Sequence, residues 1–542
     1  MLTWDARGFG GSGGTVMIDS PDFEGRDVQA LIDFVAAQPE AQLDAPGDPR
    51  LGMSGGSYGG GIQLVTAGID DRVDVITPTI SWNSLRTSLF RSEAIKLGWG
   101  AALIGVGIPT SVALGVFSPA GIQTGNQSPE FYSTVAEGSA SGSVSESNKQ
   151  WFGAHGPDFL LRNIDIPTLL IQGEPDTLFT LDEADANYRA LKANGIPLKM
   201  VWFCGGHAVC LTKSDSSSST LGDSARAQEA RLAWFARYLG NDKSVDTGPA
   251  FEWIDENGEF HASEGYPLNE VGKLEGTGSG QLPLAQGASS AGSGFAVAAS
   301  PSPVSVSAPI PTPAEPVDVL GAPRLDLTYS GVAVPGQTFV YAQIVDSARN
   351  IVVNNQATPI PVTLDGQDHT LSLPLETIAS RTTAAGYELQ IIPGTSVYDI
   401  QRSNGFIDVS SAHVELPVSE PVGLGAGPNC SDPQKGTPGA DKIKGSDGPD
   451  AISGGSGRDR LKGRGGNDCL AGQSGGDGLG GGAGDDLMRA GRGADRVSGG
   501  AGRDDIRAAG GGNDVVRCGP GRDRAKVDRG DRVRGCERVK RR

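Results

Sequence analysis

The C-terminal segment of the chain repeats every nine residues, and this period limits the folds open to it more than any other feature. Aspartate recurs at this interval from Asp441 to Asp504, and after a one-residue insertion the register resumes at Asp514. An apolar residue lies two positions after each aspartate. Because the aspartate and the apolar position keep the same spacing over ten repeats, the sequence predicts a repeat architecture. The ten aspartates are Asp441, Asp450, Asp459, Asp468, Asp477, Asp486, Asp495, Asp504, Asp514 and Asp523.

Charge is spread unevenly along the 542 residues. The whole chain carries a net charge of −19, from 64 acidic and 45 basic residues. Residues 430–542 hold 23 Lys or Arg and 17 Asp or Glu, so this part is near +6 and the remainder near −25. An acidic balance argues against a general nucleic-acid binder, which needs clustered Lys and Arg for the phosphates. The basic excess suggests a different partner for the tail, an anionic cell-envelope polymer.

Six cysteines form an even set, and three disulfides are the simplest interpretation in an exported protein. Cys204 and Cys210 bracket His207, which favours a short disulfide that fixes the histidine loop over zinc binding or unpaired thiols. No uninterrupted apolar run reaches the ~18 residues of a membrane span, and no signal peptide is evident. The cysteines nevertheless favour an extracellular or cell-surface location, in conflict with the lack of a signal peptide.

Pattern changes divide the chain into successive domains. Apolar runs that alternate with helical periods predict an α/β domain, with Leu2–Trp4 as the end of a strand. Two-residue alternation from Phe251 onward predicts an all-β sandwich, and the Gly/Ser/Ala/Pro-rich stretch 276–316 is interpreted as a flexible excursion. The expected segments are residues 1–243 (α/β, with a helical cap at about 84–165), 244–418 (β-sandwich), 419–435 (linker), 436–528 (repeats) and 529–542 (basic end).

A nucleophile elbow is the first catalytic signal. Gly55-Gly56-Ser57-Tyr58-Gly59 fits G-x-S-x-G and lies between a short strand and a helix, which is the context that the motif requires. Ser57 would be the nucleophile, and the amide of Tyr58 at the helix N-terminus would be one oxyanion donor. In a Gly-rich chain the same motif also occurs as a structural turn, so partners are needed.

The partners follow in the order Ser, acid, His that α/β-hydrolases use. Asp176 comes directly after the predicted strand 168–172, although Glu174 and Asp182 compete for the role. His207 follows the predicted strand 198–203 and is the well-placed one of five histidines; the alternative is a surface-loop histidine. The predicted roles are attack by Ser57, proton transfer by His207 and orientation of the imidazole by Asp176. No cofactor is expected for catalysis.

The stretches around these residues resemble the X-Pro dipeptidyl-peptidase and cocaine-esterase-like family of serine hydrolases. The matching segments are LTWDARGFGGSGG (2–14), DPRLGMSGGSYGGG (48–61), LLIQGEPDTLF (169–179), FCGGH (203–207) and, from the family's C-terminal jelly-roll, LGAPRLDLTYSG (320–331). The resemblance covers residues 1 to about 418. It implies Ser-Asp-His hydrolysis of X-Pro peptides or of small esters and amides. Glu93 and Glu130 are candidates for binding a substrate amine.

The tail resembles the calcium-binding nonapeptide repeats of secreted bacterial proteins, which form a parallel β-roll. Gly454-Gly455-Ser456-Gly457-Arg458-Asp459-Arg460-Leu461 matches the G-G-x-G-x-D-x-U pattern. In such rolls the turn carboxylates and backbone carbonyls bind Ca²⁺. Arg458, Arg503 and Arg522 adjoin aspartates and could replace Ca²⁺ as counter-charges, so binding at every turn is not expected. The alternative is a disordered Gly-rich tail.

The family pattern also leads us to expect residues upstream of Met1. In this fold, a strand before the Asp5-Ala6-Arg7-Gly8 turn carries the second oxyanion donor, and it lies beside the nucleophile strand. We expect such a strand and an export signal to precede the sequence given. The leading hypothesis is therefore a secreted serine hydrolase with a calcium-binding tail. The second hypothesis is a catalytically silent, surface-associated calcium-binding protein that retains the scaffold.

Overall fold

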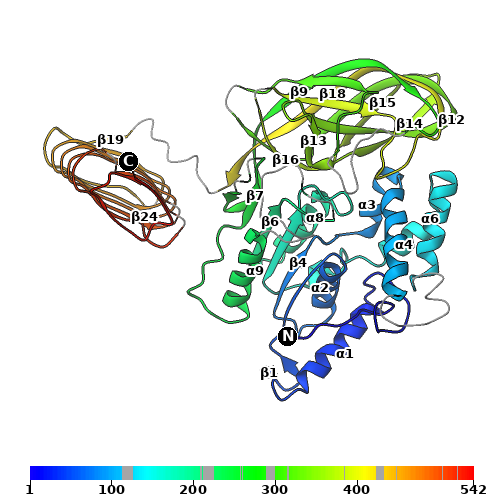
Figure 1. Ribbon diagram of the computed structural model, residues 1–542, viewed down its shortest axis with the longest axis horizontal. Helices are drawn as coiled ribbons and strands as arrows, with labels where there is room; N and C mark the ends of the chain where they lie inside the picture. Colours follow the sequence, from blue (N-terminus) through cyan, green and yellow to red (C-terminus); the bar gives the residue numbers. More distant parts are fainter. Residues whose placement is uncertain are drawn as a thin grey trace. The chain divides into compact units, whose positions relative to one another are not determined.

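A computed structural model describes residues 1–112, 126–207, 210, 225–256, 258, 260–288, 299–313, 316–383, 385–422, 433–446, 448–502, 504–508, 510–521 and 523–541. The chain forms two compact units. The first consists of residues 1–262 and 268–420, and the second of residues 263–267 and 421–542. Each unit is described on its own (Figure 1).

The first unit contains a six-stranded sheet whose strands follow one another in chain order. Neighbouring strands are parallel from β3 to β7. β4, β5 and β7 are buried along their whole length, as expected for a parallel sheet covered on both faces. The strands are β3 (Gly52–Gly56), β4 (Val75–Thr79), β5 (Thr168–Gly173), β6 (Leu198–Phe203), β7 (Phe251–Ile254) and β8 (Phe260–Ser263).

Helices cover this sheet. α2 follows the nucleophile strand and buries most of its residues, whereas α9 packs Ala227, Ala230 and Trp234 onto the sheet core. These helices are α1 (Glu24–Ala36), α2 (Tyr58–Ile69), α8 (Leu181–Lys192) and α9 (Ala225–Tyr238); a short hairpin, β1 (Leu43–Ala45) and β2 (Asp48–Pro49), follows α1. The α/β domain predicted from the sequence is confirmed.

A group of helices forms the predicted cap between β4 and β5. Its aromatic core includes Trp82, Phe131 and Phe152 and is continuous with Tyr341 and Tyr398 of the β-rich region. The elements are α3 (Leu85–Leu89), η1 (Arg91–Glu93), α4 (Leu97–Val112), α6 (Pro129–Ser141), α7 (Glu146–Gly153) and η2 (Leu161–Asn163). In the part of the chain that the structure describes, no helix is long and apolar enough to cross a membrane.

The β-rich region is one rolled, antiparallel ten-stranded sheet around a large apolar core. The 23-residue β12 holds it together: its first half pairs with β15 and β18, and its second half with β14 and β17. The strands are β9 (Gly265–Leu284), β10 (Val306–Ile310), β11 (Asp318–Gly321), β12 (Arg324–Asp346), β13 (Ile351–Val352), β14 (Thr358–Asp365), β15 (His369–Pro374), β16 (Ile378–Arg381), β17 (Tyr387–Ile392) and β18 (Asn404–Val422), with η3 (Val353–Asn355) after β13.

Three local expectations differ from the structure. Leu2–Trp4 forms no strand. β7, which the alternating pattern placed in the β-sandwich, instead pairs in parallel with β6 of the first sheet. The stretch 276–316 is not a flexible excursion throughout, because β9 continues to Leu284 and β10 lies within it; residues 289–298 and 314–315 are outside the described residues.

The tail is a two-faced stack of short parallel strands (Figure 1). Successive strands alternate between the two sheets, so that each strand pairs with the one about 18 residues later. The apolar residue of each repeat points into one core, from Ile443 to Val527. One sheet holds β19 (Gln434–Lys435), β21 (Ala451–Ser456), β23 (Cys469–Ser474), β25 (Leu487–Arg492), β27 (Asp505–Ala508), β29 (Arg524–Val527) and β31 (Arg538–Arg541). The other holds β20 (Lys442–Lys444), β22 (Arg460–Gly465), β24 (Gly478–Ala483), β26 (Arg496–Ala501), β28 (Val515–Arg517) and β30 (Arg532–Arg534).

Candidate active site and candidate calcium sites

The turn between β3 and α2 has the geometry of a nucleophile elbow. Ser57 has φ 56° and ψ −117°, a strained conformation for a residue with a Cβ. Glycines make the turn possible: a Cβ on Gly55 would lie 2.9 Å from the Gly59 carbonyl oxygen, and one on Gly60 would lie 2.6 Å from the Thr79 carbonyl oxygen. The serine is therefore held at the carboxyl end of β3 by backbone packing.

The three residues predicted as a triad lie together at the carboxyl ends of parallel strands. Asp176 follows β5, and His207 follows β6. His207 Nε2 is 2.6 Å from Ser57 Oγ, and His207 Nδ1 is 2.8 Å from Asp176 Oδ2. This connected arrangement of hydroxyl, imidazole and carboxylate is what proton transfer from the serine requires.

Asp176 is completely buried, and backbone donors fix both of its oxygens. Its Oδ1 accepts the N–H groups of Leu178 and Phe179 at 2.9 and 3.0 Å, and its Oδ2 also accepts the N–H of His207 at 3.1 Å. These hydrogen bonds fix the orientation of the carboxylate, so Asp176 is placed to orient the His207 ring.

The competing acids have other partners. Glu174 Oε1 accepts the N–H of Ile254 at 3.3 Å. Asp182 is paired with Arg91. The geometry therefore favours Asp176 as the acid.

A disulfide joins Cys204 and Cys210, as predicted for the histidine loop. It leaves neither sulfur as a thiolate for zinc. A second disulfide joins Cys518 and Cys536 in the tail, whereas Cys430 of the expected third pair lies outside the described residues.

Tyr58 opens α2, so its amide has no earlier helical carbonyl to bind and is available to an anion beside Ser57. Its side chain is anchored elsewhere: the phenol donates to Glu24 Oε1 at 3.0 Å and accepts the N–H of Asp19 at 3.3 Å. Burial raises the pKa of this phenol, with help from the two nearby carboxylates, and keeps it protonated. The amide of Tyr58, rather than its hydroxyl, is therefore the group placed to act on a substrate oxygen.

An apolar pocket of about 200 Å³ opens at Ser57 beneath the cap. The rings of Trp99 and Phe179 lie edge-on to the His207 ring, with centroids 5.8 and 5.1 Å away. None of the described residues that line the pocket is acidic: they are Phe9, Val16, Ile18, Ser57, Tyr58, Trp82, Leu85, Leu89, Leu103, Gln127, Phe131, Leu178 and Phe179. The pocket suits an apolar acyl group.

The two glutamates proposed to bind a substrate amine do not line this pocket. Glu93 pairs with Lys149 and lines a separate cavity against the β-rich region. Glu130 lies in the first turn of α6. Neither placement supports the amine-binding role.

Sequence reasoning missed two residues outside the first sheet that donate hydrogen bonds to the acid loop, the loop after β5 that carries Asp176. Gln356, at the end of η3, donates its side-chain N–H to the Asp176 carbonyl oxygen at 2.9 Å. Lys96 Nζ donates to the Leu178 carbonyl oxygen at 3.0 Å. Both side chains are buried. A pattern within the sequence cannot reveal such contacts, because they join segments about 80 and 180 residues from the loop.

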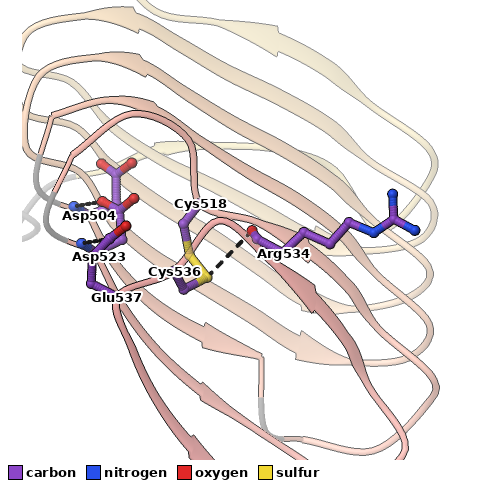
Figure 2. The surroundings of a disulfide bond; sticks show 6 residues. All are labelled: Asp504, Cys518, Asp523, Arg534, Cys536 and Glu537. Atoms are coloured by element: carbon purple, nitrogen blue, oxygen red, sulfur yellow. Dashed lines mark hydrogen bonds between the residues drawn. A yellow bond between two sulfur atoms is a disulfide. The ribbon is translucent and has the colours of Figure 1, made fainter.

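The tail aspartates form two continuous rows. In each row the Oδ1 of one aspartate accepts the backbone N–H of the aspartate one coil earlier, as Asp477 does from Asp459 at 2.8 Å. Figure 2 shows the end of the second row, where Asp523 accepts from Asp504 and donates to Glu537. The first row is Asp441, Asp459, Asp477, Asp495, Asp514 and Asp531; the second is Asp450, Asp468, Asp486, Asp504 and Asp523, followed by Glu537.

In eight of these carboxylates the second oxygen is buried and has no hydrogen-bond partner among the described residues. This holds for the Oδ2 atoms of Asp459, Asp468, Asp477, Asp486, Asp495, Asp504, Asp514 and Asp523. Burial, reinforced by neighbouring carboxylates, raises the pKa of Asp486 and Asp504 to about 7. Buried carboxylate oxygens without partners fit a hard divalent cation such as Ca²⁺.

Backbone carbonyls would have to complete any such site. Among the described residues, no three His, Cys, Asp or Glu side chains form a metal-binding group, and Ca²⁺ takes about six to eight oxygens. Arg458 Nε donates to the Gly476 carbonyl oxygen at 3.2 Å, which leaves this turn less suited to a cation. Arg503 and Arg522 lie outside the described residues.

Two families match separate parts of the chain. Residues 1–209 match the X-Pro dipeptidyl-peptidase (S15 family), and four overlapping stretches, 435–470, 445–479, 471–506 and 480–516, match the RTX calcium-binding nonapeptide repeat. No curated protein matches the sequence. Both resemblances expected from the sequence motifs are confirmed.

Several solved structures share the fold over about three quarters of this chain. A CocE/NonD family hydrolase from Staphylococcus aureus is 13% identical, with a TM-score of 0.52 over 77% of this chain and 78% of that one. An aminopeptidase from the marine sediment archaeon Thaumarchaeota archaeon is 12% identical, with a TM-score of 0.54 over 76% and 84%. An α-amino acid ester hydrolase gives the same four values. At these identities the likeness concerns the fold.

Proposed function

We propose that this chain, which joins an X-Pro dipeptidyl-peptidase (S15 family) segment to RTX calcium-binding repeats, is a serine hydrolase. The observation that carries the proposal is the unbroken contact from Ser57 Oγ through His207 to the buried Asp176. The strained serine backbone supports it further, because such strain is typical of functional sites.

In the proposed mechanism, Ser57 Oγ attacks the acyl carbon of the substrate while His207 Nε2 accepts its proton. Asp176 stabilises the resulting imidazolium through Nδ1. The amide of Tyr58 donates to the developing oxyanion. His207 then protonates the leaving amine or alcohol. A water molecule, deprotonated by the same imidazole, releases the acyl group from Ser57.

The proposed substrates are X-Pro peptides or small esters and amides. Of these, an ester or amide with an uncharged acyl group agrees best with the apolar pocket beside Ser57, because no described residue that lines it is acidic and could bind the free amine of an X-Pro peptide. An aminopeptidase and an ester hydrolase are both among the structures with this fold, and the family matched by residues 1–209 is a dipeptidyl-peptidase.

We further propose that the aspartate rows of the tail bind Ca²⁺ between successive coils. The eight buried oxygens without partners support this assignment, and bound Ca²⁺ would neutralise the carboxylates that face one another along each row. RTX repeats and disulfides are typical of extracellular proteins, so the proposed location is outside the cell or at its surface.

Labelling with a fluorophosphonate tests the hydrolase proposal directly. We expect the folded full-length protein to react at Ser57, and Ser57→Ala to abolish both labelling and turnover of Xaa-Pro-p-nitroanilides or p-nitrophenyl esters, by at least about 10⁴-fold. Ser54→Ala, which removes an exposed hydroxyl on the same strand, is the matched control and should react normally. A folded wild-type protein that is not labelled would instead support a catalytically silent calcium-binding protein.

A further inference from the structure

Basic side chains form an in-register column on one face of the tail. The outward residues at the third position of β25, β27, β29 and β31 are Arg489, Arg507, Lys526 and Lys540, each paired directly with the next. Neighbouring strands lie about 4.8 Å apart, so the column presents one cation per strand. We refer to these four residues as the cationic ladder.

Two further basic register pairs lie in the tail, one on the ladder's sheet and one on the opposite sheet. On the same face, Arg524 is in register with Arg538, and on the other sheet Arg517 is in register with Arg534. Arg534 is exposed, and its side chain is drawn in Figure 2. A hollow of about 480 Å³ on the ladder's face is lined by Asp505, Arg507, Arg524, Ala525, Lys526, Arg538, Val539 and Lys540.

Such a column opposes folding unless something neutralises it, because like charges directly opposite on neighbouring strands repel. Arg507 has one acidic neighbour, Asp505, at 3.3 Å. Within the described residues, no carboxylate forms an ion pair with Arg489, Lys526 or Lys540, and three of the four ladder side chains are exposed. The ladder is therefore a regular set of cations available to an external ligand.

The composition of the tail narrows the class of that ligand. Residues 430–542 contain no Phe, Tyr, Trp or His, so the surface has no aromatic ring on which a base could stack. Single-stranded nucleic acids depend on such stacking. A linear polymer with anionic groups along its own backbone fits a row of evenly spaced cations.

We propose that the cationic ladder is a binding surface for a linear anionic polysaccharide. The polymer lies along the axis of the roll, across the strands, and its sulfate or carboxylate groups contact Arg489, Arg507, Lys526 and Lys540. This interaction needs neither Ser57 nor the hydrolytic reaction. It would hold the protein on an anionic glycan while the catalytic unit acts on its own substrate.

Binding of chondroitin sulfate to the full-length protein in Ca²⁺-containing buffer tests the proposal. We expect the combined variant Arg489→Gln, Arg507→Gln, Lys526→Gln, Lys540→Gln to bind at least about tenfold more weakly, with a shallower dependence of log K on log salt. The matched control removes four exposed cations that have no basic register partner: Lys435→Gln, Arg492→Gln, Arg496→Gln and Arg529→Gln. Neutral dextran should not bind either protein.

Two outcomes would overturn the proposal. An equal loss of affinity in both variants would mean that only net charge matters and that the ladder is not a site. Duplex DNA that competes at equal charge concentration, with the same sensitivity to the ladder variant, would assign the surface to nucleic acid instead. Far-ultraviolet circular dichroism of each variant establishes that the roll remains folded, and unchanged ester hydrolysis establishes that the catalytic unit is intact.

Discussion

Without Ca²⁺, the tail should be stable in mild acid and unfold as the pH rises through neutrality. Burial, together with repulsion between carboxylates of one row, raises the pKa of Asp468 and Asp514 to about 6 and that of Asp486 and Asp504 to about 7. An unfolded aspartate titrates near about 3.9. Between these values the folded tail binds more protons than the unfolded one, so stability is fully present below about pH 4 and is lost as the pH rises through about 6 to 7.

The size of the effect follows from the four shifts. Shifts of about two and three pKa units correspond to roughly 3 and 4 kcal/mol per carboxylate. Even buried charges in proteins are screened by an effective dielectric well above that of a dry interior, so we take about half of the sum, on the order of 7 kcal/mol. This is comparable to the whole stability of a domain, about 5–15 kcal/mol. We therefore expect the loss of these protons to unfold the roll when Ca²⁺ is absent.

The intact protein allows the two units to be followed separately. All seven tryptophans lie at or before Trp253, and the tail has no aromatic residue, so tryptophan fluorescence reports the first unit alone. Hydrogen exchange of peptides from residues 433–541 reports the tail. In metal-free buffer we expect protection of these peptides at pH 5, its loss at pH 8, and its recovery at pH 8 with millimolar Ca²⁺, while tryptophan fluorescence stays constant.

Asp486→Asn is the matched variant for this experiment. It keeps an Oδ1 acceptor for the Asp468 N–H group but removes one buried charge. The metal-free tail of the variant should remain folded to higher pH, and its Ca²⁺ affinity should fall. Equal protection of the wild-type tail at pH 5 and pH 8 in chelator would refute the assignment of the pH dependence to these carboxylates.

Three further predictions concern the first unit. Gln356→Ala leaves the Asp176 carbonyl without its donor; we expect a loss of about 1–3 kcal/mol in unfolding free energy and a roughly 10- to 100-fold lower kcat/KM, measured by denaturant titration and ester hydrolysis. Glu252→Gln leaves the buried Lys199 without its carboxylate and should cost about 3–5 kcal/mol, read by tryptophan fluorescence. Mild reduction of the disulfide that brackets the proposed catalytic histidine should lower kcat and leave this fluorescence unchanged.

Periodicity predicted the parts of the fold in which local sequence and burial agree. The period of nine located the core of the roll, and the strand patterns located β5 and β6. The interpretation of residues 276–316 as a flexible excursion was wrong for a physical reason. A Cβ on Gly276 would lie 2.6 Å from the Pro309 carbonyl oxygen, and one on Gly278 would lie 2.1 Å from the Ser307 carbonyl oxygen. These glycines permit close approach between backbones, whereas composition alone suggested flexibility.

The order of Ser57, Asp176 and His207 along the chain was sufficient to select three residues that the fold brings together. Their order is informative because each residue follows a strand of the same parallel sheet. The supporting residues follow no such rule. Gln356 lies in a different sheet domain, and its hydrogen bond to the acid loop depends on how two domains pack.

This packing has a consequence for what constitutes the catalytic unit. Gln356 of the β-rich region donates to the loop after β5, at the Asp176 carbonyl oxygen. Glu376 of the same region accepts from this loop, from the Thr180 hydroxyl at 2.9 Å. Burial raises the pKa of Glu376 to about 7, and the charged groups around this carboxyl also influence its pKa. The cap adds the bond from Lys96 to Leu178. Because the loop that carries Asp176 is fixed by both the cap and the β-rich region, residues 1–243 without the β-rich region should keep the serine elbow and lose the position of Asp176. The smallest competent hydrolase is therefore expected to be the whole first unit.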